Sequence, residues 1–274
     1  MQKHGGGSGC MPAGTGAIPR PTRAIAGQRP VFARQFTLSR AGAPRSEPGH
    51  ASRGDVSYIE SSSSTRACRM SIEVDRHGRR TAWLTARLCT VLGVSAIESR
   101  DWAVAALTHD IGKLDLPPAL LAKPGALDAD ERCLVERHCI AGAKRLMARA
   151  RPDGDETTTA AIAVALSHHE WWNGQGYPFG LAGTAIPRCA RIVAMADVLD
   201  ALTSVRPYKP AWPLQAALDH VLARRGTQFD PECVDAMEIA ARTLPADWQG
   251  TAQAWGLQMT LELGRPARVL LDAT

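Results

Sequence analysis

Apolar residues recur at three- and four-residue spacing through most of the chain after residue 70, the pattern of helices with one buried face. Trp83, Leu84 and Leu88 show this spacing in a first helix, which we expect to begin at Ser71 and to stop at Gly93. Similar patterns predict further helices over residues 96–108, 157–169, 186–204, 213–225 and 231–243. The sequence therefore predicts an all-α fold.

Two shorter signals complete the expected architecture. Asp128 followed by Glu131 is a capping-box pattern, and we expect it to start the helix that carries His138. Period-two alternation is confined to residues 259–263 and 267–271, which could pair as a short β-hairpin. We therefore expect one helical domain over residues 69–243 and a small C-terminal extension over residues 244–274.

The first 68 residues differ in composition from the rest of the chain. They are rich in Gly, Ser, Pro and Arg, so they bury too little apolar surface to fold, and we expect a disordered leader over residues 1–68. Up to Gly54 this leader holds eight basic residues and one acid, so the net charge of +5 belongs to it. An organelle transit peptide is also Arg-rich, but we prefer an unstructured leader or a start assigned too far upstream. The basic charge is thus no reason to expect nucleic acid as a partner.

The cysteines and the apolar runs indicate the compartment. The seven cysteines are scattered, odd in number and include no Cys-x-x-Cys, which favours reduced thiols in a cytoplasmic protein over disulfides or a zinc ribbon. No apolar run approaches the roughly 18 residues that a membrane span needs. We expect a cytoplasmic protein that contacts no membrane.

His109 and Asp110 stand side by side at the end of the predicted 96–108 helix. An imidazole and a carboxylate directed at one small volume are ligands for a first-row metal. Lys113 adds a cation that could hold an anionic substrate or leaving group. Taken alone, however, such a pair is more often a surface hydrogen bond, so the interpretation depends on further ligands.

Further candidate ligands lie in or at the ends of the other predicted helices. Each alone has an ordinary alternative: a solvated helix residue for His77 or His138, a helix C-cap for His168, or a buried acid paired with Arg for Asp197. Together, so many inward-facing polar groups would be costly to bury unless a metal binds them. Imidazole with carboxylate suits two or more ions of iron, manganese or another borderline metal. The full candidate set is Glu73, His77, His109, Asp110, His138, His168, His169 and Asp197.

A series of motifs over about residues 70–242 resembles one known family. The chain is similar to an HD-GYP domain, the cyclic di-GMP phosphodiesterase branch of the HD metal-dependent phosphohydrolases. The motifs that carry the resemblance are His109–Lys113, Lys123–Gly125, His138 with Gly142, His168–Glu170, Asn173–Pro178, Gly180–Gly183, Ile186–Pro187, Ala190–Ile192, Ala196–Asp197, Asp200–Ser204, Arg206–Lys209 and Phe229–Pro231.

The resemblance implies an HD-type helical bundle with two or three divalent ions, iron or manganese. It implies that Asp110 bridges the metals and that Glu73 permits a third ion. Lys113 would contact the scissile phosphate. Tyr177 would line the site or dock a partner such as a diguanylate cyclase (GGDEF) domain. The residues implied to bind the nucleotide are Lys113, Tyr177, Arg206 and Lys209.

The implied reaction is hydrolysis of cyclic di-GMP to pGpG, with GMP as a further product. Two departures from the family pattern are Asp115, where many members have Gly, and Asn173, where Asp is frequent. No receiver or sensor pattern precedes the first helix, so we expect activity that is constitutive, gated by metal or controlled in trans. Whether the domain is an oligomer stays open.

Two other functions stay open. The first is an HD phosphohydrolase for a linear nucleotide or another cyclic dinucleotide. The second is a non-catalytic module that binds a partner through the loop around Tyr177.

Overall fold

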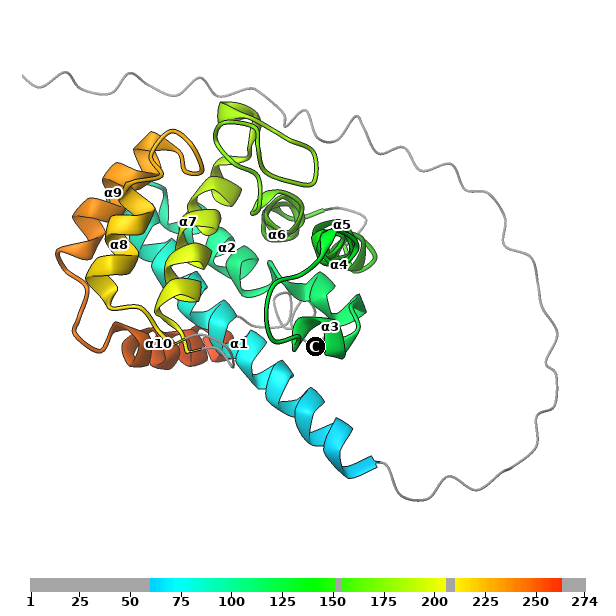
Figure 1. The fold of residues 1–274 in the computed structure, drawn as a ribbon. Coiled ribbons are helices and arrows are strands. Elements are labelled where there is room, and N and C mark those ends of the chain that lie inside the picture. The colour runs from blue at the N-terminus through cyan, green and yellow to red at the C-terminus, as the bar shows by residue number, and fades with distance from the viewer. Residues whose placement is uncertain (1–59, 151–153, 206–209, 263–274) are drawn as a thin grey trace, which may run out of the picture. The chain divides into compact units, whose positions relative to one another are not determined.

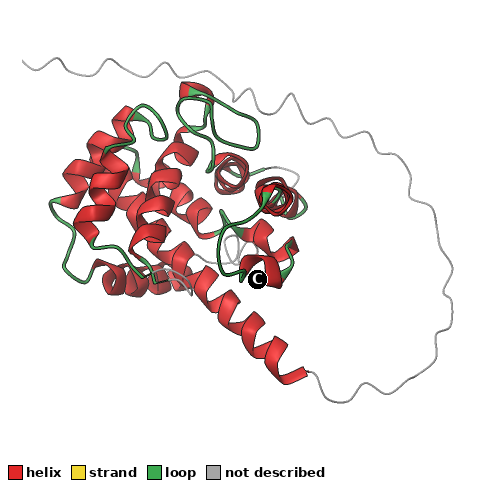
Figure 2. Cartoon of the chain, viewed as in Figure 1, coloured by secondary structure: helices red, strands yellow, loops and turns green. Residues whose placement is uncertain are grey.

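The computed structural model describes residues 60–150, 154–205 and 210–262, and for residues 60–75 and 257–262 it describes the helical backbone alone. Within these residues the chain is a helical bundle without strands, which confirms the predicted all-α class (Figures 1 and 2). The α-helices are α1 (Glu60–Val91), α2 (Ala96–Leu107), α3 (Pro118–Leu121), α4 (Ala129–Glu136), α5 (His138–Met147), α6 (Glu156–Ser167), α7 (Arg188–Thr203), α8 (Leu214–Leu222), α9 (Pro231–Ala241) and α10 (Trp248–Glu262); the 3₁₀ turns are η2 (Ile111–Asp115) and η3 (Gly183–Ala185).

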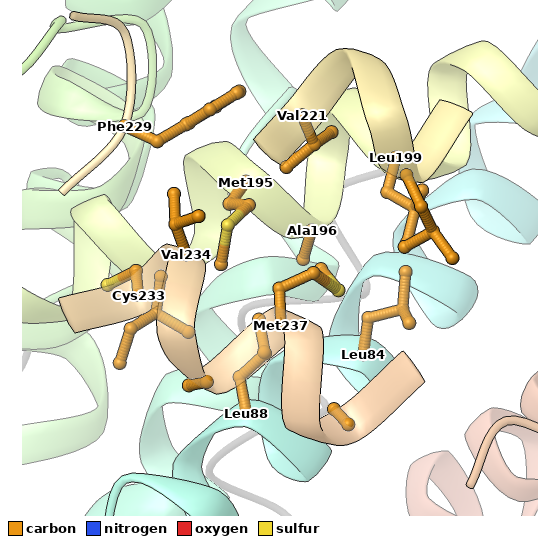
Figure 3. Close-up of a cluster of buried hydrophobic side chains, with 14 of the residues drawn as sticks. Leu84, Leu88, Met195, Ala196, Leu199, Val221, Phe229, Cys233, Val234 and Met237 are labelled. Carbon is orange, nitrogen blue, oxygen red and sulfur yellow. The ribbon is translucent and has the colours of Figure 1, made fainter. Parts of the chain in front are cut away.

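One part of the core joins α1 and α7 to α8 and α9. Leu84 and Leu88 of α1, Met195 and Leu199 of α7, and Met237 of α9 are all at most 2% exposed. Figure 3 shows these side chains meeting between the helices. Burying one such side chain stabilises the fold by roughly 1.5–3 kcal/mol. This packing fixes α1 against α7, the two helices that carry His77 and Asp197.

The other part of the core is built from small side chains. Alanines dominate the facing surfaces of α2 and α6, and helices can approach more closely where the side chains between them are small. The chain segments that follow these two helices carry His109 and His168, whose ring centroids lie 5.0 Å apart. The buried alanines are Ala103, Ala105, Ala106, Ala160, Ala161 and Ala165.

Gly112 lies where η2 meets α5 backbone to backbone. A Cβ atom at this position would overlap the carbonyl oxygen of His138 and the amide nitrogen of Gly142. Only glycine leaves room for this contact, since it lacks a Cβ. The contact brings the segment that begins at Asp110 next to the first turn of α5.

The ends of two helices differ from our predictions. The first helix begins at Glu60 rather than Ser71, so residues 60–68, which we expected to be disordered, are helical; residues 1–59 lie outside the described part. The Asp128–Glu131 capping box is confirmed, but α4 ends at Glu136, and His138 starts a separate helix. The reason is that the ring of His138 bonds to the carbonyl of Val135, which in an unbroken helix would accept from residue 139.

The predicted hairpin is wrong over residues 259–262, because α10 continues through them. Trp248 and Ala252 are buried in the core, and Trp255 packs against it at the next helical position. This helical spacing of buried residues outweighs a short alternating pattern. Residues 263–274 lie outside the described part. No helix in the described ranges has both the length and the apolar character to cross a membrane.

Candidate metal centre

Seven of the eight predicted ligands meet in the interior of the bundle. They form two groups, and within each group the ligand atoms lie within 4.8 Å of one another. Glu73 belongs to α1, but its side chain lies outside the described part of the structure. The first group is His77, His109 and Asp197; the second is Asp110, His138, His168 and His169.

The two oxygens of Asp110 face the two groups. Oδ2 lies 3.4 Å from His109 Nε2 and 3.9 Å from His77 Nε2. Oδ1 lies 3.4 Å from His138 Nε2 and 3.7 Å from His168 Nε2. One carboxylate thus contributes an oxygen to each side, which is the arrangement of a ligand shared by two ions.

Three of the histidines are oriented by the helix ends next to them. The last four carbonyls of a helix lack partners within the helix. In the last turns of α2, α4 and α6 one carbonyl is 2.6–2.9 Å from an imidazole Nδ1, and the carbonyl of α6 also accepts the backbone N–H of His168. Because a carbonyl only accepts, Nδ1 carries the hydrogen and the Nε2 lone pair faces the cluster. The pairs are His109 with Ala106, His138 with Val135 and His168 with Val164.

The donor set fits divalent metal ions. His109 Nε2 and Asp110 Oδ1 are buried and have no hydrogen-bond partner. Leaving such atoms unsatisfied costs about 1–3 kcal/mol each. Ligands on a common ion at about 2.1 Å lie roughly 3–3.5 Å apart, close to the 3.0–3.9 Å between four His–Asp pairs of ligand atoms here.

The protonation of the cluster also favours metal binding. Burial lowers the pKa of His109 to about 4 and that of His138 to about 4, so both are neutral at pH 7. Burial also holds the pKa of His169 well below its usual range. Burial raises the pKa of Asp110, but Lys113 and the imidazoles outweigh it and hold that pKa well below its usual value. A neutral imidazole and an ionised carboxylate are the forms that bind metals.

The pKa of His77 is raised, unlike the lowered pKa values just described for three other histidines. Burial lowers its pKa, but Asp197 and Asp200 outweigh burial and raise the pKa to about 9. In the metal-free protein at pH 7, His77 is therefore a cation with a proton on each ring nitrogen, and an ion that binds at Nε2 must displace the proton there. We expect calorimetric metal titrations in buffers of different ionisation enthalpy to show release of about one proton at pH 7 and little release above pH 9. A His77→Gln variant should lose this release; equal release from both proteins would contradict the assignment.

Glu170, the last residue of the His168–Glu170 motif, organises the loop that follows it. Its side chain is buried and accepts the backbone N–H of Phe179 at 2.8 Å and of Leu181 at 3.0 Å. This holds the loop so that the ring of Tyr177 stacks on His169, with centroids 4.7 Å apart. The predicted substrate residue Tyr177 thus lies beside the second ligand group.

Replacing Glu170 with Gln should loosen this loop, because an amide presents a donor to one of the two N–H groups. The loss is about 1–3 kcal/mol. Hydrogen exchange at the amides of Phe179 and Leu181 should then become on the order of 10- to 100-fold faster. Glu232→Gln, at an exposed pair with Arg188, is the control. Unchanged protection in the Glu170 variant would show that other contacts hold the loop.

The remaining predicted site residues have different outcomes. Lys113 lies at the edge of the cluster, with Nζ 2.6 Å from Asp110 Oδ2 and its side chain 27% exposed. Arg206 and Lys209 lie outside the described residues. The unusual Asp115 is ion-paired with Arg145. Asn173 accepts the N–H of Gln175 at 3.0 Å within the loop.

Sequence reasoning missed Asp200 as a site residue. Its Oδ2 lies 2.6 Å from His77 Nδ1, on the far side of the ring from the cluster. The available signal was its spacing, because Asp197 and Asp200 are three apart on one helix and therefore share a face.

Comparisons with known proteins identify the family of the chain. The family model described as HD domain matches residues 66–233. The chain is 47% identical over 148 residues to the cyclic di-GMP phosphodiesterase response regulator RpfG of Xanthomonas campestris, covering 53% of this chain and 38% of that protein. It is 35% identical over 167 residues to 3'3'-cGAMP-specific phosphodiesterase 2 of Vibrio cholerae, covering 61% of this chain and 31% of that protein.

A solved structure shares the fold. The crystal structure of a cyclic GMP-AMP specific phosphodiesterase of V. cholerae aligns with a TM-score of 0.50 and 22% identity, over 72% of this chain and 52% of that one. The chain spans less than half the length of the two relatives. The family match shows that the chain belongs to the HD domain family, and its His109–Asp110 and Gly176–Pro178 motifs resemble those of the HD-GYP branch.

Proposed function

We propose that the chain is a metal-dependent phosphodiesterase that hydrolyses cyclic di-GMP to linear pGpG. The observation that carries the proposal is the pair of buried ligand groups on either side of Asp110, with Lys113 at the edge. The similarity to a relative named as a cyclic di-GMP phosphodiesterase supports the substrate. Addition of one water breaks one P–O bond of the ring, and a second hydrolysis would convert pGpG to two GMP.

The groups would hold two divalent ions, iron or manganese, because their donors are imidazole nitrogens and carboxylate oxygens without thiolate. Glu73 would add a third. Two such ions supply Lewis acidity and lower the pKa of a water. The proposed ligands that lie together in the two groups or between them are His77, His109, Asp110, His138, His168, His169 and Asp197.

Other side chains of the chain would act on the substrate. The ammonium of Lys113, partly exposed beside Asp110, would neutralise charge on the scissile phosphate. Tyr177 would pack against the nucleotide beside His169. Arg206 and Lys209 would bind the phosphates or bases. Since phosphodiester hydrolysis depends mostly on positioning and charge stabilisation, these cations would set both affinity and rate.

A second candidate substrate is 3'3'-cGAMP. It is favoured by the 35% identity to a relative named for that activity. A non-catalytic binding module is less well supported, because partner binding requires none of the seven clustered ligands, six of which are buried.

The test uses the full chain, loaded without oxygen with Fe(II) or Mn(II) and assayed with both cyclic dinucleotides by chromatography of the products. We expect pGpG from cyclic di-GMP and about two metal equivalents. The His109→Ala/Asp110→Ala variant should lose metal and activity, whereas His220→Ala, which removes a histidine outside the two groups, should keep both. A fully active double variant would refute the proposal.

We also propose a cytoplasmic location, which the five described cysteines support, since all are free. A regulator acting in trans or a GGDEF domain would contact the loop around Tyr177. Size-exclusion chromatography of the chain with such a domain, compared with Tyr177→Ala, tests this contact and reports the oligomeric state.

A further inference from the structure

A second buried carboxylate lies directly behind the metal-facing histidine of α1. Asp200 is 0% exposed and its Oδ2 accepts from His77 Nδ1 at 2.6 Å. On the other side of the ring, His77 Nε2 lies 3.0 Å from Asp197 Oδ1. The imidazole is therefore held between two carboxylates of α7 that are one helical turn apart.

Arg80 completes this arrangement one turn along α1 from His77. Its Nε donates to Asp200 Oδ1 at 2.6 Å, and its Nη2 donates to Asp200 Oδ2 at 3.1 Å. Nη2 also donates to the hydroxyl of Ser204, at the C-terminus of α7, at 3.0 Å. Such bidentate, charge-assisted bonds fix planar groups strongly and in one geometry. They lock Asp200 in place relative to both helices.

These contacts exclude a role for Asp200 as a direct ligand. Both of its oxygens are engaged by Arg80, and one also accepts from His77. Within the described residues Asp200 belongs to neither ligand group, and its carboxylate bonds to Nδ1 of His77, the ring nitrogen opposite the one that faces Asp197.

The ring orientation of His77 depends on a contact between helices, unlike that of His109, His138 and His168. His109, His138 and His168 bond through Nδ1 to a carbonyl three or four residues before them, so the local backbone fixes their rings. The Nδ1 partner of His77 is 123 residues away in sequence and lies on another helix. The same helix, α7, supplies Asp197, which shares the first ligand group with His77.

We propose that Asp200, held by Arg80, is a positioning residue that sets the metal affinity of the first ligand group. The proposal rests on the proposed metal-dependent function and deepens it. By accepting from Nδ1, Asp200 fixes the tautomer that presents Nε2 to the ion, and its charge makes the imidazole a stronger donor. Removing such a partner of a metal-binding histidine typically weakens binding about 10- to 100-fold.

The test measures metal binding directly. Asp200→Asn should bind one equivalent of Mn(II) about 10- to 100-fold more weakly than the unaltered chain, in titrations with a competing chelator. The second equivalent should keep its affinity, because the second ligand group does not touch Asp200. Substituting Co(II) provides a spectroscopic signature, since the absorption of one of the two ions should change.

Asp230→Asn is the matched control. Asp230 is buried and pairs with Arg191 of α7, so this variant also disrupts a buried Arg–Asp pair, outside the ligand groups. It should lower the melting temperature but leave both equivalents bound with unchanged affinity. Equal weakening of metal binding in the two variants, or none in Asp200→Asn, would overturn the proposal.

A second variant distinguishes a loss of metal affinity from a loss of folding. Asp200→Asn leaves the buried guanidinium of Arg80 without its full counter-charge, which is destabilising. The Arg80→Met/Asp200→Leu double variant removes both charges together and should fold while showing the same selective loss of one equivalent. Retention of both equivalents in this folded variant would refute the proposal. If the unaltered chain binds two ions but hydrolyses no cyclic dinucleotide, the proposed function fails while this inference stands.

Discussion

Replacing Asp110 with Asn is expected to weaken both metal equivalents at once and to lower cyclic di-GMP hydrolysis by about 10³-fold or more. The reason is geometric, because one oxygen of Asp110 faces each ligand group. An amide has a single carbonyl oxygen and no charge, so it can serve one ion at most. Metal analysis and initial rates on the same preparation measure both effects.

Comparison with His138→Ala makes this prediction specific. His138 belongs to one group alone, so its loss should weaken one equivalent and spare the other. Asp235→Asn, at an exposed pair with Arg225, controls for loss of a carboxylate. Binding of both ions with unchanged affinity by Asp110→Asn would show that this carboxylate is not shared.

Removal of the metal should cause the largest change in stability. An ion that binds only the folded chain at 1,000 times its dissociation constant contributes about 4 kcal/mol. In a domain of 150–250 residues, each kcal/mol shifts the melting temperature by about 2–4 °C, so chelation should lower it by about 8–16 °C. The structural cause is the pair of buried acceptors, His109 Nε2 and Asp110 Oδ1, that the ion would satisfy.

Thermal unfolding with and without a chelator measures this shift. The His109→Ala/Asp110→Ala variant is the control, because it lacks the two unsatisfied atoms and should unfold at the same temperature in both conditions. A chelator effect of equal size on that variant would mean that the metal stabilises the chain elsewhere.

The positions of the candidate ligands could be predicted largely because local structure determines them. His109 directly follows a predicted helix and His168 lies in the last turn of another, and in the folded chain each ring bonds to a carbonyl of the adjacent helix end. His168 therefore caps the helix through Nδ1 and also presents Nε2 to the cluster. In the sequence alone these two roles stand as alternatives. Helical periodicity likewise predicted most of the bundle, since each helix has its own apolar face.

The parts that could not be predicted depend on contacts between distant segments. The spacing from Asp197 places Asp200 on the same face of α7, but it does not indicate that His77 will lie 2.6 Å away, because that contact requires α1 to pack on α7. The break before His138 arises because a side chain competes for a backbone carbonyl. The helix over residues 248–262 was mistaken in part for a hairpin because its apolar face is recognisable only against the core that covers it.

Because of Gly112, a complete set of metal ligands in a sequence is not enough to indicate an active site. Because η2 and α5 touch at this glycine, its missing side chain sets the separation between Asp110 and His138. A single change to alanine would force these two segments apart while every metal-binding residue stayed in the sequence. Related chains that keep all of these ligands but have a larger residue at this position should therefore lack phosphodiesterase activity. Such chains could act only by binding partners.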